Sequence, residues 1–176
     1  MGIALAGRYL DFTFTNLYNS GFFCLGVTSE NVAQLTTGLV SVLAPSIKNL
    51  TLEKKPAPMA ITTRPGSPPK LTLGGGTDVK TDPLITLKLE KFAVDFYVWS
   101  YDRFVRAFTF TSDITVPLNL QTGKTEKNPN GGLQPTLGGL VVANPQISNN
   151  DLLTENPQQV AIALQELISG LVGQLL

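Results

Sequence analysis

The segment from Leu84 to Leu120, LITLKLEKFAVDFYVWSYDRFVRAFTFTSDITVPLNL, carries the most regular pattern in the chain. Apolar residues alternate with polar ones, as they do in a strand that buries one face. Before Lys91 the apolar side chains fall on odd numbers, and after it they fall on even numbers. A one-residue slip of this kind is typical of a β-bulge, which bends and twists a strand. The segment therefore predicts a long, bent hairpin that turns at residues 100–103.

The second arm of this hairpin predicts one continuous apolar face from Phe104 through Arg106, Phe108 and Phe110 to Leu120. Both arms approach about sixteen residues, whereas most strands have about five or six. Strands of that length twist and coil strongly. We therefore expect an α+β fold in which a long, highly curved antiparallel meander with a bulge wraps around two helices.

Two segments predict the helices that fill this curve. Residues 29–50 place apolar side chains at helical spacing after Ser29, a plausible N-cap, and Pro45 should kink or end that helix near Ala44. Residues 157–176 form a second apolar stripe, with Asn156 as N-cap and Pro157 in the first turn. Near the start of the chain, the alternation in residues 10–15 predicts another strand.

Composition limits the function classes. The 176 residues, 43% of them apolar, suffice for a single domain over 1–176 with its own core. The net charge of zero gives no broad electrostatic footprint for nucleic acid, so we expect no nucleic-acid partner. The chain has no histidine, and Cys24 is its only cysteine, expected to be a small buried hydrophobe. We therefore expect no enzyme, no cofactor and no metal site.

The chain ends suggest a piece of an exported protein. Residues 1–8 lack the features of a signal peptide. Residues 160–176 approach the length of a membrane span, but their polar residues argue against one. Leu176 follows an apolar helix with no capping residue, so we expect a fragment of a longer chain whose signal sequence lies upstream.

Three segments, taken in order, resemble a known family. They are PMAITTRPGSPPKLTL at residues 58–73, the long hairpin at 84–120 and the final helix at 156–176. This arrangement resembles the tubular lipid-binding (TULIP) superfamily, which includes domains like those of bactericidal/permeability-increasing protein. The disulfide of some animal members is absent, so the likeness is to the wider superfamily. The resemblance implies an apolar groove between helices and sheet, acyl chains of lipid or lipopolysaccharide as partners, and an extracytoplasmic location, periplasmic or secreted.

The candidate site residues follow from these patterns. The groove candidates are Val32, Leu35, Leu39, Leu43, Ile47, Phe92, Phe96, Phe108, Phe110, Leu164, Ile168 and Leu171. Candidates for contact with a membrane surface are Trp99, Tyr101 and Arg103, near the hairpin turn. The alternative for the first set is ordinary core packing, and for the second, strand-end residues that cap the sheet. The alternative function is a structural or protein-interaction module with a fully packed interior. The sequence leaves the lipid and the oligomeric state open.

Overall fold

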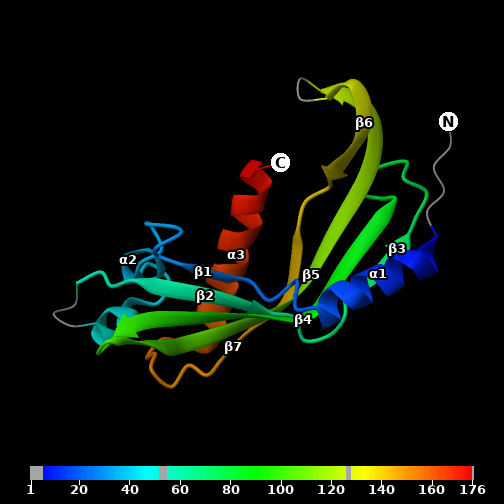
Figure 1. The fold of residues 1–176 in the computed structure, drawn as a ribbon. Helices are drawn as coiled ribbons and strands as arrows, with labels where there is room; N and C mark the ends of the chain where they lie inside the picture. Colours follow the sequence, from blue (N-terminus) through cyan, green and yellow to red (C-terminus); the bar gives the residue numbers. More distant parts are fainter. Residues whose placement is uncertain (1–5, 52–54, 126–127, 176) are drawn as a thin grey trace.

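The computed structural model describes residues 6–51, 55–125 and 128–175, and in this part of the chain one antiparallel sheet of seven strands combines with a few helices (Figure 1). In chain order the elements are α1 (Gly7–Asn19), β1 (Gly26–Thr28), α2 (Thr37–Val40), the 3-10 helix η1 (Pro45–Leu50), β2 (Met59–Arg64), β3 (Lys70–Leu73), β4 (Ile85–Ser100), β5 (Arg103–Thr125), β6 (Asn128–Leu137), β7 (Val141–Ser148) and α3 (Pro157–Leu175).

The predicted long hairpin is the centre of the sheet. β4 has 16 residues and β5 has 23, and they pair along nearly the whole of β4. β2 and β3 both pair with the edge of β4 that faces away from β5. β6 and β7 both pair with the edge of β5 that faces away from β4. Figure 1 shows the hairpin running across the molecule and then turning upward, with α3 standing in the angle. The predicted α+β class with a strongly curled antiparallel sheet is confirmed.

The curl has a local cause in two bulges that lie on either side of β5. In β4 the register jumps between Leu89 and Phe92, and Lys91 has a positive φ of 52°, which confirms the bulge predicted at this residue. In β7 the register with β5 shifts beside the same part of β5, and Asn144 has a φ of 51°. Bulges bend and twist the strands that contain them. The two bulges lie beside the same residues of β5, and together they bend the sheet there.

A further bulge was not predicted. Phe96 pairs with Phe108 but Tyr97 pairs with Arg106, so Ala107 is the extra residue. The extra residue moves Arg106 and Phe104 to the face of β5 opposite Phe108, and the prediction that these side chains share one face is wrong. Beyond Phe108 the apolar face continues through the paired residues Val98 and Val105, and Val98 is buried.

The core lies on the face of the sheet that bears Phe96 and Phe108. Its buried cluster also contains Leu35, Val40, Ala44, Ile47, Met59, Val98, Ala107, Phe110, Val142, Val160 and Leu164. α3 packs on β7, and Gln165 Nε2 donates to the Val142 carbonyl at 2.7 Å. The predicted N-cap is confirmed, because Asn156 Oδ1 accepts the backbone N–H of Gln158 at 2.9 Å.

The strand predicted at residues 10–15 and the continuous helix predicted over residues 29–50 are both wrong. Residues 7–19 form α1 rather than a strand, because Leu10, Phe14 and Leu17 also fit a helical period. Residues 29–50 form no continuous helix but only α2 and η1. The reason is competition for the backbone: the Leu35 carbonyl accepts the Met59 N–H, and the Thr37 N–H donates to the Ala57 carbonyl.

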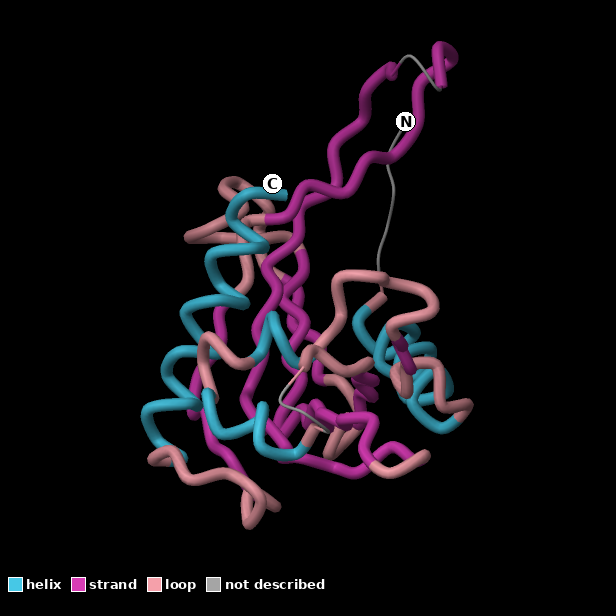
Figure 2. The backbone as a smooth tube through the Cα atoms, turned by 90° about the vertical axis from the view of Figure 1, so that its left-hand side faces the viewer, coloured by secondary structure: helices cyan, strands magenta, loops and turns pink. Residues whose placement is uncertain are grey.

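The two longer helices flank the strands from different sides. α3 packs on β7, whereas α1 contacts β3. Figure 2 shows the strands between them in that view. None of the residues of α1 is buried. The segment 29–50, although not a continuous helix, therefore shares the core with α3, and α1 contributes no buried residue to it.

Candidate functional site

Three of the four predicted groove phenylalanines lie in the core. Phe96, Phe108 and Phe110 are all buried, and the rings of Phe96 and Phe108 stack with centroids 4.5 Å apart. Ile47 and Leu164 belong to the same buried cluster. Side chains therefore fill this half of the sheet face, which agrees with the core-packing alternative for these five residues.

The remaining groove candidates are scattered. Leu35 is also in the buried cluster, and Leu43 and Ile168 pack against it while staying partly exposed. Phe92 is half-buried at the bulge. Val32 and Leu39 are exposed. Leu171 belongs to α3, but its side chain lies outside the described residues.

Beyond the bulge, the same sheet face continues as an aliphatic strip that the sequence analysis did not single out. Leu71 pairs with Leu87 and Leu87 with Val116, while Leu73, Ile85, Leu118 and Leu137 form a second row across four strands. We call these seven residues the aliphatic strip. All seven are at least partly exposed, and Leu73 and Leu137 keep 40% of their surface. The strip joins the core through Leu89, so one apolar face is fully packed at one end and partly exposed at the other.

The membrane-contact candidates gather at the other end of the hairpin. Trp99 and Phe104 form an edge-to-face pair with ring centroids 5.0 Å apart, and they keep 39% and 41% of their surface. Tyr101 and Arg103 are exposed beside them. The structure therefore brings Trp99, Tyr101 and Arg103 together at one exposed edge, and adds Phe104 to them.

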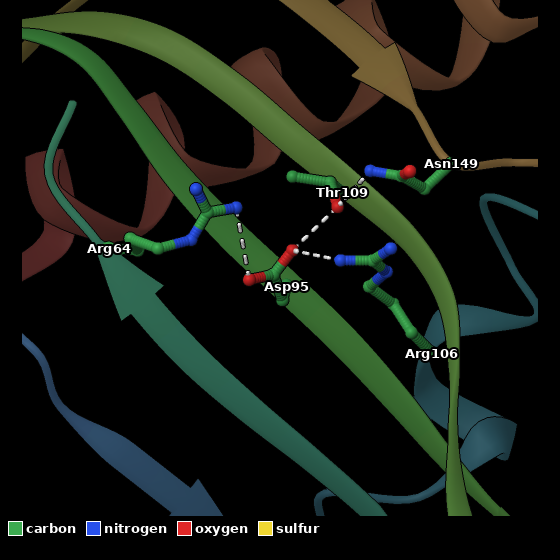
Figure 3. Close-up of polar contacts among 5 residues, drawn as sticks. All are labelled: Arg64, Asp95, Arg106, Thr109 and Asn149. Carbon is green, nitrogen blue, oxygen red and sulfur yellow. Dashed lines mark hydrogen bonds and ion pairs between the residues drawn. The ribbon is translucent and has the colours of Figure 1, made fainter.

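A polar cluster lies on the outer face of the sheet (Figure 3). Asp95 is only 4% exposed, and its Oδ1 accepts a hydrogen bond from the Thr109 hydroxyl at 2.5 Å. Arg64 Nη2 lies 3.5 Å from Asp95 Oδ2, and Arg106 Nη1 lies 3.9 Å from Asp95 Oδ1. Asn149 Nδ2 donates to Thr109 Oγ1 at 3.1 Å. These contacts compensate a buried carboxylate and tie β2, β4 and β5 to the residue that follows β7.

Carboxylates with shifted pKa values lie in loops and at bulges. The backbone N–H of Lys91 and the side chain of Asn144 hold the pKa of Asp113 below its ordinary value. Burial opposes the charge of Glu155, but hydrogen bonds from Ser46 outweigh it and lower the pKa of Glu155. Among the described residues, no group of three or more acidic, cysteine or histidine side chains could hold a metal ion. Cys24 is exposed, so the expectation of a buried thiol is wrong.

No protein-family model matches the chain, and no curated protein matches it. The resemblance to the TULIP superfamily therefore stays a prediction. None of the helices in the described part of the chain combines the length and the apolar character needed to cross a membrane.

Proposed function

We propose that this chain is a lipid-binding domain that holds acyl chains against the aliphatic strip. The observation that carries the proposal is the register of the strip: seven aliphatic side chains share one face of four strands, and none of them is buried. Leaving such a surface in water is unfavourable by roughly 25 cal/mol per Å². A ligand without polar groups is the simplest cover for it.

The shape of the strip favours an acyl chain. Its longer row, from Leu73 to Leu137, crosses three strand spacings, or about 14 Å. Each methylene removed from water contributes about 0.8 kcal/mol, so a chain lying along this row would bind mainly through burial. Burial has no direction, and we expect weak selectivity for the length and identity of the chain.

The direct test is extraction and native mass spectrometry of the gently purified protein. The Leu87→Gln variant places an amide in the centre of the strip and should lower lipid occupancy. Thr86→Gln is the matched control, because Thr86 is the neighbouring, similarly buried residue on the opposite face of β4. Equal lipid occupancy in both variants, or none in the unmodified protein, would overturn the proposal.

A second candidate function, a protein-interaction module, rests on α1. Tyr9 and Phe12 each keep 68% of their surface, and Phe22 and Leu25 just after the helix are exposed too. Exposed apolar surface of this kind often marks an interaction site. Concentration-dependent association that is lost in a Phe12→Gln variant, with lipid occupancy unchanged, would favour this second function.

An extracytoplasmic location, periplasmic or secreted, accompanies the lipid-binding proposal and rests on the resemblance to the TULIP superfamily. A fractionation experiment on the source cells tests it. Recovery of the protein only with cytoplasmic markers would contradict this location.

A further inference from the structure

A hollow of about 370 Å³ lies between the end of β1 and the turn end of the β4–β5 hairpin. It is lined by Thr28, Ser29, Glu30, Pro58, Trp99 and Phe104. Its volume falls in the range of small-molecule sites, about 300 to 1,000 Å³. We propose that this hollow binds a quaternary ammonium group, such as the trimethylammonium group of choline.

The aromatic pair supplies the first reason. Trp99 and Phe104 meet edge to face, at an interplanar angle of 75°. In this arrangement the contact itself uses one face of one ring. Ring faces carry negative electrostatic potential and attract cations, and tryptophan does so most strongly. Both rings remain partly exposed and within reach of a ligand.

Glu30 supplies the second reason. It is the only charged residue among those that line the hollow. Its carboxylate has no hydrogen bond or ion pair with another described residue. A helix was expected to begin after Ser29, but none begins there, so no helix N-terminus lies beside the Glu30 carboxylate. A carboxylate without an ion-pair partner in the described part of the chain, beside two aromatic rings, attracts a cation and repels an anion.

An arginine on this face of the sheet has a carboxylate beside it. Arg106 lies on the same face of β5 as Phe104. Figure 3 shows its guanidinium directed toward Asp95, whose Oδ1 lies 3.9 Å from Nη1. The Asp95 carboxylate, which Arg64 also contacts, therefore offsets part of the positive charge of Arg106.

Backbone hydrogen bonds hold the walls of the hollow in place. The Ser29 N–H donates to the Met59 carbonyl at 3.0 Å, and the Trp99 N–H donates to the Pro58 carbonyl at 2.9 Å. A site that is already formed loses less entropy when a ligand binds. A quaternary ammonium group donates no hydrogen bonds, so ring faces and one carboxylate are the features it requires.

The test uses Trp99, the only tryptophan in the chain, as its own reporter. Choline is titrated into the protein while Trp99 fluorescence is followed, in parallel with 3,3-dimethylbutan-1-ol, a neutral molecule of the same shape. We expect saturable binding of choline and none of the alcohol. Glu30→Gln and Phe104→Leu should each weaken choline binding about two- to fivefold, the range that corresponds to a partly exposed cation–π or charge contact.

Two controls separate the site from general effects. Glu166→Gln makes the same charge change at an exposed position of α3, and Tyr101→Leu removes an exposed aromatic ring that does not line the hollow. Both should bind choline as the unmodified protein does. Circular dichroism checks that the folded content of each variant is unchanged. Equal responses to choline and to the alcohol, or equal weakening in the controls, would overturn the proposal.

Vesicles distinguish the two sources of the ligand. Preference for phosphatidylcholine over phosphatidylglycerol vesicles, lost in Glu30→Gln, identifies a lipid headgroup. Binding of free choline without this preference identifies a free cation. Trp99 lies on the face of β4 opposite Leu87, so this site and the aliphatic strip are independent, and a Leu87→Gln variant should keep its choline binding.

Discussion

Asp113 accepts the backbone N–H of Lys91 at 2.8 Å through Oδ1, and it accepts the Asn144 side-chain amide at 2.7 Å through Oδ2. Lys91 and Asn144 are the positive-φ residues of the bulges in β4 and β7. One carboxylate in β5 therefore fastens the bulges on both of its sides. This contact links the sequence of β5 to the curl of the whole sheet.

The first prediction concerns this carboxylate. Asp113→Ala removes the acceptor for both bulges, and we expect it to lower the free energy of unfolding by about 1–2 kcal/mol, since the contacts are hydrogen bonds to a charged but partly exposed group. Urea denaturation measures the change. Asp151→Ala, at an exposed turn, is the control and should have little effect. Equal stability of the two variants would show that Asp113 does not hold the bulges.

The second prediction concerns acid. The pKa values of Asp113 and Glu155 are lowered in the folded state. Lowered carboxylate pKa values contribute stability above the unfolded values of about 4, and this contribution disappears as the pH falls through the folded values. We therefore expect thermal stability to fall below about pH 4, and to fall less steeply in Asp113→Ala and Glu155→Gln. A melting profile between neutral and acidic pH that is the same in all three proteins would contradict this.

The third prediction concerns the buried carboxylate of Asp95. Thr109→Val removes the hydroxyl that donates to it and keeps the shape of the side chain. Because the buried carboxylate then loses its closest donor, we expect a loss of about 1–3 kcal/mol in the free energy of unfolding. Thr109→Ser retains the hydroxyl and should recover most of the loss. Chemical denaturation measures the stability of both variants. If Thr109→Val is as stable as Thr109→Ser, the hydroxyl does not stabilise the buried carboxylate.

The fourth prediction separates the packed end of the sheet face from the open end. Phe108 is fully buried, so Phe108→Ala should cost about 3–5 kcal/mol, because it leaves a cavity. Leu87→Ala, in the aliphatic strip, should cost clearly less, because Leu87 is only half-buried. Denaturant midpoints of the two variants measure the difference. Similar losses would mean that the strip is as tightly packed as the core.

The parts of the fold that could be predicted are those in which one periodicity dominates. The alternation around Lys91 predicted both β4 and its bulge, and Asn156-Pro157 predicted the start of α3. In residues 10–17 the apolar spacing fits both a strand and a helix, so the sequence alone could not decide. Ala107 could not be recognised as a bulge, because Phe104 and Val105 are both apolar and either could face the core.

The candidate site was harder to predict than the fold. Phe96 and Phe108 are buried, and the aliphatic strip is partly exposed, because other segments cover only one part of the sheet face. The local sequence pattern of a strand does not show which part will be covered. The hollow at Trp99 depends on the meeting of Glu30 and Phe104, which lie far apart in the sequence. Its aromatic half could be anticipated from the hairpin turn, but its carboxylate could not.

The central claim is that acyl chains lie on the aliphatic strip, and methyl NMR with a spin-labelled fatty acid tests it most directly. The claim predicts that the methyl signals of Leu87, Val116 and Leu118 lose intensity on binding, while those of the buried Val98 and the exposed Val32 do not. Loss of intensity at Val32 without loss at the strip, or no loss at any of these methyl groups, would contradict the claim.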